Sequence, residues 1–306
     1  MNGYKKIIRS QAMRHKILRF LKFVPDKTMI KLQYWIKLRR LPDLKNPKRY
    51  TEKLQWYKLY YKNPLMVRCA DKYDVRQYVE DKGLGNILNK CYGVYDHVED
   101  IDFDNLPNQF VLKDTLGGGG NAVIIVKDKE TADLNSIKLQ MQKWVSENPK
   151  IKTGGREWPY YSGKKHRIIV ERFIPSNEVD GGLIDYKFFC FGGSCKYLYV
   201  IADRKLGQPS GIGIFDRDYN YKDCYRMDEK PLERKIPKPD NYDRMVSVAE
   251  KLSEDFPHAR IDLFDQNGEI LFGEITFYDG SGYMKFDPDA FDFELGEKFV
   301  LPEKRV

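Results

Sequence analysis

From residue 108 onward the chain alternates β-branched and aromatic segments with glycine-rich or polar turns. Residues 108–115, 122–128 and 166–175 have the composition of strands. Two further pairs of strand-like segments flank Gly192-Gly193 and Asn267-Gly268, and dipeptides of this kind favour the tight turns of hairpins. Because a hairpin joins antiparallel neighbours, the sequence predicts sheets that are mostly antiparallel.

The part of the chain before Gly83 predicts helices instead. Apolar spacing, capping residues and proline breaks indicate helices at residues 4–24, 28–40, 51–61 and 71–82. The apolar side of the second helix is expected to carry Met29, Leu32, Trp35 and Ile36. Two later helices are expected near residues 138–147 and 241–254. This order predicts the α+β class, with a helical N-terminal region followed by mostly antiparallel sheets.

Composition narrows the class of protein. With 306 residues, 42% of them apolar, the chain is long enough for a substantial core and does not have the composition of a disordered protein. No apolar stretch approaches the ~18 residues of a membrane span, and the basic N-terminus lacks the features of a signal peptide. The five cysteines form no CxxC pair, which favours reduced thiols over disulfides or a zinc site. We therefore expect a cytoplasmic protein.

Basic charge is concentrated at the N-terminus. Residues 1–60 contain 17 Lys and Arg but only three acidic residues, whereas the remaining 246 residues carry a net charge of −6. Such a segment suits an anionic membrane surface, a nucleic acid or an acidic glycan. It is also compatible with a solvated face on helices that pack against the rest of the protein, and the sequence leaves these alternatives open.

A lysine and four glycines lie between two expected strands at residues 110–126. Lys113 ends the first strand, and Gly117–Gly120 precede the second. Glycines let backbone N–H groups approach an anion closely, so this arrangement suits polyphosphate binding. It is not a Walker A loop, because no Gly-Lys-Ser/Thr follows and the next element is expected to be a strand. A flexible hairpin tip is the alternative interpretation.

The C-terminal hairpin carries acidic and basic side chains within apolar strands. Alternation groups the side chains of each strand face as follows: Arg260, Asp262 and Phe264 in the first strand, and Phe272, Glu274 and Thr276 in the second. If the two faces coincide, two carboxylates and a hydroxyl lie beside an arginine, and such oxygen ligands suit Mg²⁺ shared with a nucleotide's phosphates. A pair of exposed acids on an amphipathic hairpin is the alternative.

A third segment, residues 168–189, has a strand ending near Glu171, a turn at Pro175 and a second strand beginning at Asp185. Backbone groups of such a connection can hold adenine, and an acidic side chain can hold the ribose hydroxyls. An ordinary connection between two strands is the alternative.

Taken in order, these motifs resemble the ATP-grasp superfamily, and more narrowly the TupA-like ATP-grasp proteins associated with teichuronopeptide and other surface-polysaccharide biosynthesis. The resemblance extends from about residue 40 to about residue 285. It is carried by NPKRYTEKLQWYKLY, CADKYDVRQYV, GREWPY at residues 155–160, DYKFFCF and FGEITFYDGSG. It implies an ATP-grasp fold, in which two α+β lobes with antiparallel sheets enclose ATP. The expected division is residues 1–64 for the basic helical region, 65–174 for the N-terminal lobe with its glycine-rich lid, and 175–306 for the C-terminal lobe with the metal site.

The resemblance also implies roles by position. Lys72 and Lys113 are expected to bind the phosphates of ATP, and Gly117, Gly118, Gly119 and Gly120 to form a lid over them. The hinge expected to bind adenine consists of Glu171, Arg172, Phe173 and Ile174. The two candidates for binding the ribose are Asp185 and Glu178. The expected Mg²⁺ ligands are Asp262, Glu274 and Thr276, and the basic residues around the transferred phosphate are Arg260, Lys187 and Arg204. Two departures concern Thr276, where many members of the superfamily have Asn, and the large preceding domain of many members, which basic helices replace here.

The function implied is an ATP- and Mg²⁺-dependent carboxylate–amine ligase that works through an acyl phosphate. The resemblance suggests a uronic-acid-containing surface glycan or its precursor as the acid and an amino acid as the amine, with peripheral contact to an anionic membrane or to polysaccharide assembly enzymes. No nucleic acid is expected as a partner. The alternatives are a kinase or glycosyltransferase-like enzyme of the same pathway, or a non-catalytic scaffold docked at the membrane.

Overall fold

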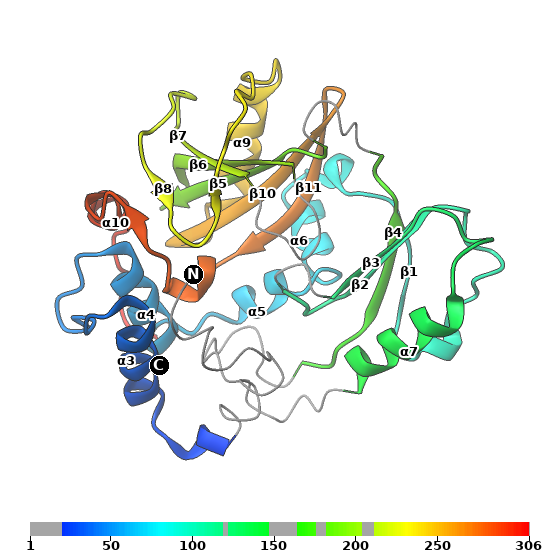
Figure 1. Ribbon diagram of the computed structural model, residues 1–306, viewed down its shortest axis with the longest axis horizontal. Coiled ribbons are helices and arrows are strands. Elements are labelled where there is room, and N and C mark those ends of the chain that lie inside the picture. Colours follow the sequence, from blue (N-terminus) through cyan, green and yellow to red (C-terminus); the bar gives the residue numbers. More distant parts are fainter. Residues whose placement is uncertain (1–19, 119–121, 147–163, 176–181, 204–210, 306) are drawn as a thin grey trace.

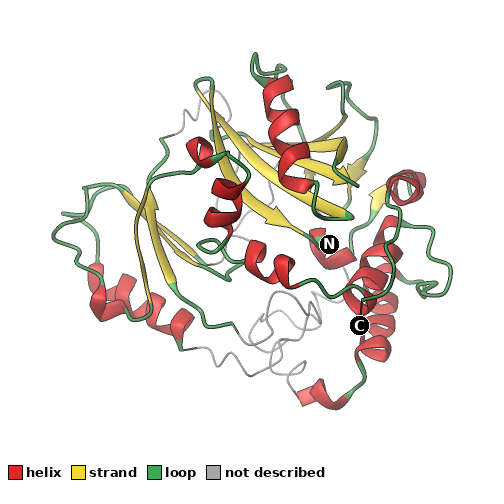
Figure 2. Cartoon of the chain, turned by 180° about the vertical axis from the view of Figure 1, so that it is seen from behind, coloured by secondary structure: helices red, strands yellow, loops and turns green. Residues whose placement is uncertain are grey.

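The computed structural model describes residues 20–118, 122–146, 164–175, 182–203 and 211–305. Two separate β-sheets dominate these residues, and short helices α5 (Pro64–Ala70) and α6 (Val75–Asp81) lie between them (Figure 1). The same arrangement is seen from behind in Figure 2. The α+β class and the mostly antiparallel sheets expected from the sequence are confirmed.

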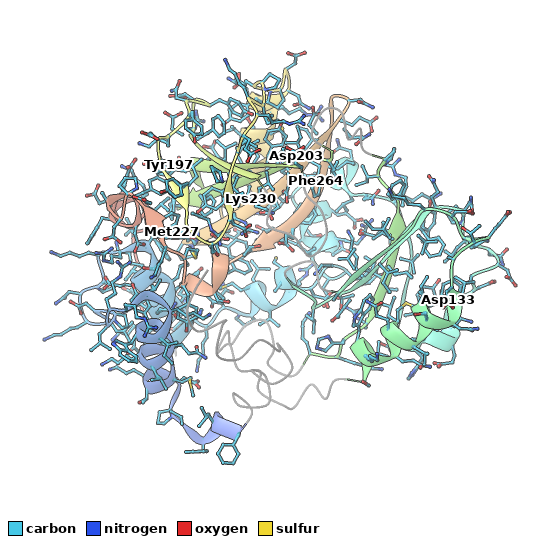
Figure 3. The ribbon with its side chains drawn as sticks, in the orientation of Figure 1. Asp133, Tyr197, Asp203, Met227, Lys230 and Phe264 are labelled. Atoms are coloured by element: carbon cyan, nitrogen blue, oxygen red, sulfur yellow. The ribbon has the colours of Figure 1, made fainter. Side chains whose placement is uncertain are left out.

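The smaller sheet has the strand order β1-β4-β2-β3 and is antiparallel throughout. Its strands are β1 (Cys91–Tyr95), β2 (Phe110–Asp114), β3 (Val123–Val126) and β4 (Ile168–Arg172). Helix α7 (Leu134–Val145) packs with this sheet in a separate hydrophobic core that includes Phe110 and Met141. Asp133 caps the helix, since its Oδ1 accepts a hydrogen bond of 3.0 Å from the Ser136 backbone N–H (Figure 3).

The larger sheet has the order β11-β10-β5-β6-β7-β9, and only its β7–β9 pair is parallel. Its strands are β5 (Asp185–Phe191), β6 (Ser194–Ala202), β7 (Gly211–Asp216), β9 (Lys230–Pro231), β10 (His258–Gln266) and β11 (Glu269–Thr276). Both expected hairpins form, turning at Gly192-Gly193 and at Asn267-Gly268, and all four of these residues have positive φ. Helix α9 (Tyr242–Ser253) covers one face of the sheet, where Ala259, Ile261 and Leu263 are buried.

The helices before the smaller sheet pack with the larger one. Met66, Cys69, Val79 and Ile87, from α5, α6 and η2 (Gly85–Ile87), belong to the same buried core as the six-stranded sheet. The three-part division with boundaries at residues 64 and 174 stays a prediction. This packing favours placing α5 and α6 with the larger sheet.

Two N-terminal helices are held against the C-terminal helix α10 (Ala290–Lys298). Asp292 of α10 accepts hydrogen bonds of 2.9 Å from the Thr51 backbone N–H and 2.7 Å from its hydroxyl, at the start of α4 (Tyr50–Tyr60). Arg40, just after α3 (Asp26–Leu38), lies 2.9 Å from the same carboxylate. Asp292 thus joins the N-terminal helices to a helix near the C-terminal end of the sequence.

The expected apolar side of α3 is wrong in part. Its buried residues are Met29, Ile30, Tyr34 and Leu38. Leu32 and Trp35, expected on the apolar side, are 44% and 48% exposed. The helix therefore turns a mixed face with Lys31, Leu32 and Trp35 to solvent.

Other differences concern helix boundaries and small elements. The helix expected at residues 71–82 begins only at Val75, and Asn63-Pro64, interpreted as a break, instead starts α5 with proline in its first turn. The expected helix at residues 4–24 lies almost entirely outside the described residues. Its described end includes the short helix η1 (Leu21–Phe23). The elements not expected from the sequence are η2, β1, η3 (Val98–Asp100), β7, β8 (Tyr225–Arg226), β9, η5 (Asp279–Gly282), β12 (Phe286–Asp287) and α10.

Candidate active site

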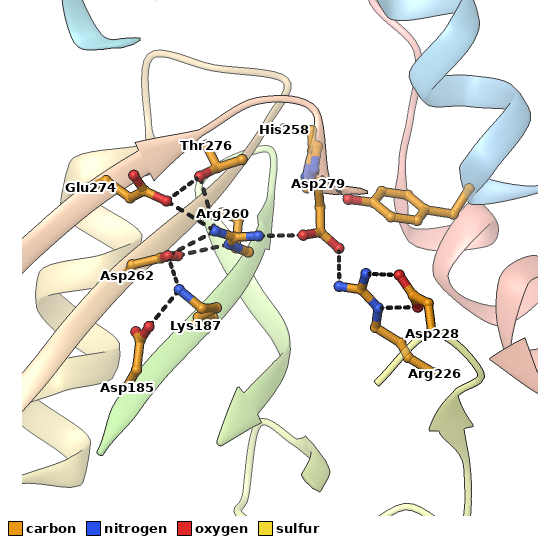
Figure 4. A network of polar contacts seen from close by, with 11 residues as sticks. Asp185, Lys187, Arg226, Asp228, His258, Arg260, Asp262, Glu274, Thr276 and Asp279 are labelled. Atoms are coloured by element: carbon orange, nitrogen blue, oxygen red, sulfur yellow. Dashed lines mark hydrogen bonds and ion pairs between the residues drawn. The ribbon is translucent and has the colours of Figure 1, made fainter. Parts of the chain in front are cut away.

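The polar face of the larger sheet brings together the acids of the C-terminal hairpin. In the β10–β11 pairing Arg260 lies opposite Thr276, and Asp262 lies opposite Glu274. Neighbouring residues across a strand pair share a face, so the expected convergence of two carboxylates and a hydroxyl beside an arginine is confirmed. Figure 4 shows these side chains directed toward one another.

One residue of that hairpin lies on the opposite face from the one expected. The register shifts by one residue between Asp262 and Leu263, so Phe272 pairs with Leu263 and is buried in the core rather than beside Glu274. Gly273 is the extra residue of this bulge, and a Cβ there would lie 2.9 Å from the Asp262 carbonyl oxygen. The bulge keeps Glu274 on the polar face although Phe272, two residues earlier, packs in the apolar core.

Asp262 is the buried centre of the cluster. Its carboxylate accepts two hydrogen bonds of 2.7 Å from Arg260 Nε and Nη2, and it also forms an ion pair with Lys187 of β5. Burial raises the pKa of Asp262 to about 6, although the nearby Arg260 and Lys187 oppose that shift. A second buried acid, Asp185, lies 2.7 Å from Lys187 Nζ, so the lysine bridges two carboxylates.

Glu274 is more accessible than Asp262, with 44% of its side chain exposed. Its Oε1 lies 3.4 Å from Arg260 Nη2 and accepts a hydrogen bond of 3.3 Å from the Thr276 hydroxyl, which itself lies 3.0 Å from Arg260 Nη2. Thr276 therefore orients both Glu274 and Arg260.

The donors of this cluster fit Mg²⁺. Carboxylate and hydroxyl oxygens are hard ligands of the kind Mg²⁺ prefers, and a dication beside Asp262 would favour its ionised form. Within the described part of the chain, no group of three His, Cys, Asp or Glu side chains is placed to hold a metal ion. Asp262 and Glu274 would thus share the ion with oxygens of a nucleotide, as is usual where Mg²⁺ accompanies phosphates.

The cluster continues beyond the residues expected from the sequence. Arg260 Nη1 also pairs with buried Asp279 of η5, whose Oδ2 lies 3.5 Å from Arg226 Nη1 (Figure 4). The opposing arginines hold the pKa of Asp279 below its usual value despite burial. Asp279 falls within the FYDGSG motif, three residues after Thr276, and this spacing is the one signal in the sequence that could have identified it.

A second polar cluster lies on the smaller sheet. Lys113 of β2 donates a hydrogen bond of 2.6 Å to Glu171 of β4, and Arg76 of α6 lies 3.6 Å from the other oxygen of that carboxylate. Lys72 donates to the carbonyl oxygen of Gly117, at the start of the glycine loop. The two expected phosphate-binding lysines are thus held separately, one by an acid and the other by the loop.

The segment after β4 connects the two sheets. Arg172 ends β4, and Asn89 fixes its backbone by donating a hydrogen bond of 2.8 Å to its carbonyl oxygen. Phe173 and Ile174 follow and are partly buried. This placement suits the hinge role, which stays a prediction.

Not every expected site residue can be located. Gly117 and Gly118 are described, but Gly119, Gly120, Glu178, Arg204 and the GREWPY segment at residues 155–160 lie outside the described residues. Some of the described site residues belong to the Asp262 cluster on the larger sheet, and Lys113 and Glu171 belong to the second cluster on the smaller sheet. Lys72 with the glycine loop, and the segment at residues 172–174, lie outside both clusters.

Comparison with known proteins gives a family match over most of the chain. The family model described as TupA-like ATPgrasp matches residues 52–300. No curated protein matches the chain. The described residues include no helix that is long and apolar enough to cross a membrane.

Solved structures of ligases show weaker similarity. D-alanine–D-alanine ligase from Bacillus anthracis is 19% identical, with 69% of this chain and 57% of that chain covered and a TM-score of 0.42. L-amino acid ligase from Bacillus licheniformis is 16% identical, with 70% and 44% covered and a TM-score of 0.44. The chain thus spans about half the length of these solved proteins.

Proposed function

The chain belongs to the TupA-like ATP-grasp family, and we propose that it is an ATP- and Mg²⁺-dependent ligase that joins a carboxylate to an amine through an acyl phosphate. The observation that carries this proposal is the Asp262 cluster, where two carboxylates opposite each other on β10 and β11 share one face with Arg260 and Lys187. Such a face can hold a metal-bound polyphosphate and neutralise the charge of a second anion beside it.

In the proposed reaction a carboxylate oxygen of the acid substrate forms a bond to the γ-phosphorus of ATP. The bond from that phosphorus to the bridging oxygen breaks, and ADP leaves. An amine then attacks the acyl carbon, phosphate leaves, and the amine loses a proton as the amide forms. Each step brings anions together, so basic side chains at fixed positions lower its barrier.

We assign roles to the described residues on that basis. Asp262 and Glu274 would hold Mg²⁺, which as a Lewis acid neutralises charge on the phosphate oxygens. Arg260 and Lys187 exchange part of their contacts with the acids for contacts with phosphate. Lys113 and Lys72 bind phosphates from the smaller sheet, and the glycine loop beside Lys72 excludes water from the acyl phosphate.

For the substrates, we propose a uronic acid of a surface polysaccharide or its precursor as the acid and an amino acid as the amine. The TupA-like family membership supports this choice. Within the cluster, Arg260, Lys187 and Arg226 are the cations with which an acidic acceptor could pair.

The product nucleotide tests the reaction class. We expect incubation with Mg·ATP, a uronic acid and an amino acid to release ADP and phosphate, because the acyl phosphate is formed at the γ-phosphorus. Hydroxylamine should trap the acyl phosphate as a hydroxamate even when the correct amine is missing. Chromatography of the nucleotides decides the question, since AMP as the main product would rule out this mechanism in favour of adenylation.

We also propose that the outward face of α3, formed by Lys27, Lys31, Leu32, Trp35 and Arg39, binds an anionic membrane from the cytoplasmic side. All five residues are exposed. Lysine and arginine near such a surface contribute about 1 kcal/mol each, and a tryptophan at the interface adds apolar burial.

Vesicle co-sedimentation tests this surface. We expect binding to anionic but not to neutral vesicles, weakening as salt rises, because exposed charges are screened within about 10 Å at ~0.1 M salt. The double variant Leu32→Ser, Trp35→Ser should reduce binding severalfold, whereas Leu139→Ser, which removes an exposed leucine from α7, should not. Equal sedimentation with both lipids, or with neither, would show that these helices only complete the fold.

A further inference from the structure

An arginine at the edge of the Asp262 cluster is held by an acid from its own turn. Arg226 of β8 is buried, with 9% of its side chain exposed, and its Nε and Nη2 bind both oxygens of Asp228 at 3.1 and 2.8 Å. Asp228 lies two residues further along the chain, and 37% of its side chain is exposed. Figure 3 marks the neighbouring exposed Met227 on this turn.

A chain of ion pairs connects Arg226 to the proposed reaction centre. Asp279 joins its guanidinium to that of Arg260, and Arg260 in turn binds Asp262 (Figure 4). Gly280 lies next to Arg226, and its positive φ of 48° and close packing against Met284 favour glycine at this position. A ligand on Arg226 would therefore lie beside the side chains that we assign to Mg²⁺ and the transferred phosphate.

A second feature beside Arg226 is the buried hydroxyl of Tyr199. Tyr199 of β6 is 1% exposed and lies opposite Lys187 in the strand pairing, and its hydroxyl has no hydrogen-bond partner among the described residues. The Arg226 guanidinium lies 5.8 Å from the centroid of its ring. An unpaired buried hydroxyl is costly, and such groups are uncommon in native proteins unless water or a ligand satisfies them.

We propose that Arg226 and Tyr199 form a subsite for a carboxylate of the acid substrate. In the absence of substrate Asp228 pairs with Arg226, and the substrate carboxylate takes the place of Asp228 when it binds. This inference rests on the proposed ligase function and specifies how its acid is recognised. The planar guanidinium matches a carboxylate with two parallel hydrogen bonds, and the Tyr199 hydroxyl supplies a third donor.

The exchange conserves charge in the buried site. One carboxylate leaves Arg226 and another arrives, so the arginine is never left as a buried cation without a partner, which would be strongly unfavourable. Asp228 is partly exposed and can be solvated after it leaves, so the exchange loses little. An uncharged sugar cannot make this exchange, so the same turn selects acids over neutral relatives.

If Asp228 competes with the substrate for Arg226, substitutions of these two residues should change uronate affinity in opposite directions. Arg226→Lys should weaken binding of uronates on the order of tenfold, because lysine loses the two-pronged contact. Asp228→Asn should strengthen it severalfold, because the competing carboxylate is gone. Tyr199→Phe should weaken uronate binding without lowering the melting temperature, since it removes a hydroxyl that has no partner among the described residues.

Calorimetric titration of the full chain tests the inference. Each protein is titrated first with Mg²⁺ and a non-hydrolysable ATP analogue, and then with glucuronate, galacturonate and mannuronate, with glucose as the neutral probe. Asp223→Asn is the control, because it removes an exposed acid from the same segment. Melting temperatures establish that each variant is folded, and Tyr199→Phe keeps the test decisive if Arg226→Lys does not fold.

The outcomes separate the subsite from the proposed function. Stronger uronate binding by Asp228→Asn, weaker binding by Tyr199→Phe and unchanged nucleotide binding support the subsite. The subsite is overturned if nucleotide binding is normal but all variants bind uronates equally well. It is also overturned if the protein binds glucose as tightly as uronates, or binds no uronate at all. In each of these cases the nucleotide site still stands. Failure of the wild-type protein to bind the nucleotide would instead overturn the proposed function.

Discussion

Asp262→Asn and Glu274→Gln are each expected to abolish ATP consumption while the protein stays folded. Mg²⁺ at a transferred phosphoryl group supplies several kcal/mol of transition-state stabilisation, so loss of a ligand corresponds to roughly 10³-fold or more in rate. The fold should survive, since Arg260 keeps its ion pair with Asp279 and Lys187 keeps its ion pair with Asp185. ADP release in the presence of a uronic acid and an amino acid measures the loss.

Two further measurements separate a metal ligand from a general structural effect. Mg²⁺ should strengthen binding of an ATP analogue, and raise the melting temperature with it, in the wild-type protein but much less in either variant. Glu269→Gln makes the same carboxylate-to-amide change at an exposed position of the same hairpin, and it should behave like the wild type. Full ATP consumption by both site variants would show that the metal assignment is wrong.

Alternation within each strand predicts part of this site, because it groups Arg260 with Asp262 on one strand and Glu274 with Thr276 on the other. The turn at Asn267-Gly268 alone would pair Asp262 with Gly273 and leave Glu274 on the opposite face. The bulge at Gly273 shifts the register by one residue and brings the two groups to one face, and it depends on how the two backbones pair rather than on alternation.

The remainder of the site depends on tertiary packing. Arg226 belongs to a two-residue strand paired with β12, and nothing in its local sequence connects it to Asp279, 53 positions away. Tertiary packing also explains why Trp35 is exposed. Two faces of α3 are apolar enough to be buried, and contacts such as the 2.8 Å hydrogen bond between Tyr34 and Thr51 determine which face is buried.

The cations of the site are held in ion pairs with acids of the protein. Lys187, Arg260, Lys113 and Arg226 each contact at least one carboxylate of the protein, so none of these cations is buried alone. This arrangement avoids the large cost of an unpaired buried charge. Under the proposed function, a polyphosphate or an acid substrate would bind by replacing these internal acids, and selectivity for anions would follow from that exchange.

His258 shows how the site face is anchored to the helical region. It begins β10, and its Nε2 lies 2.9 Å from the Tyr50 hydroxyl of α4, while its Nδ1 lies 2.8 Å from the Cys190 carbonyl oxygen. Nδ1 must therefore carry the proton that it donates to the carbonyl. Complete burial lowers the pKa of His258 to about 4, although that hydrogen bond and Asp279 oppose the shift.

The free energy of unfolding is accordingly expected to fall in acid through His258. The unfolded imidazole takes up a proton below about pH 6.5, whereas the folded one stays neutral down to about pH 4, so stability present at pH 7.5 is progressively lost between these values. For this pair of pKa values the loss is about 2 kcal/mol at pH 5. Urea unfolding at pH 7.5 and 5.0 measures this loss. The drop in the free energy of unfolding between the two pH values should be about 2 kcal/mol smaller for His258→Gln than for the wild type. His97→Gln, at an exposed position, should show the same drop as the wild type. If His258→Gln lost as much stability as the wild type, His258 would not be neutral in the folded protein, and its hydrogen bond to Cys190 would be that of an imidazolium.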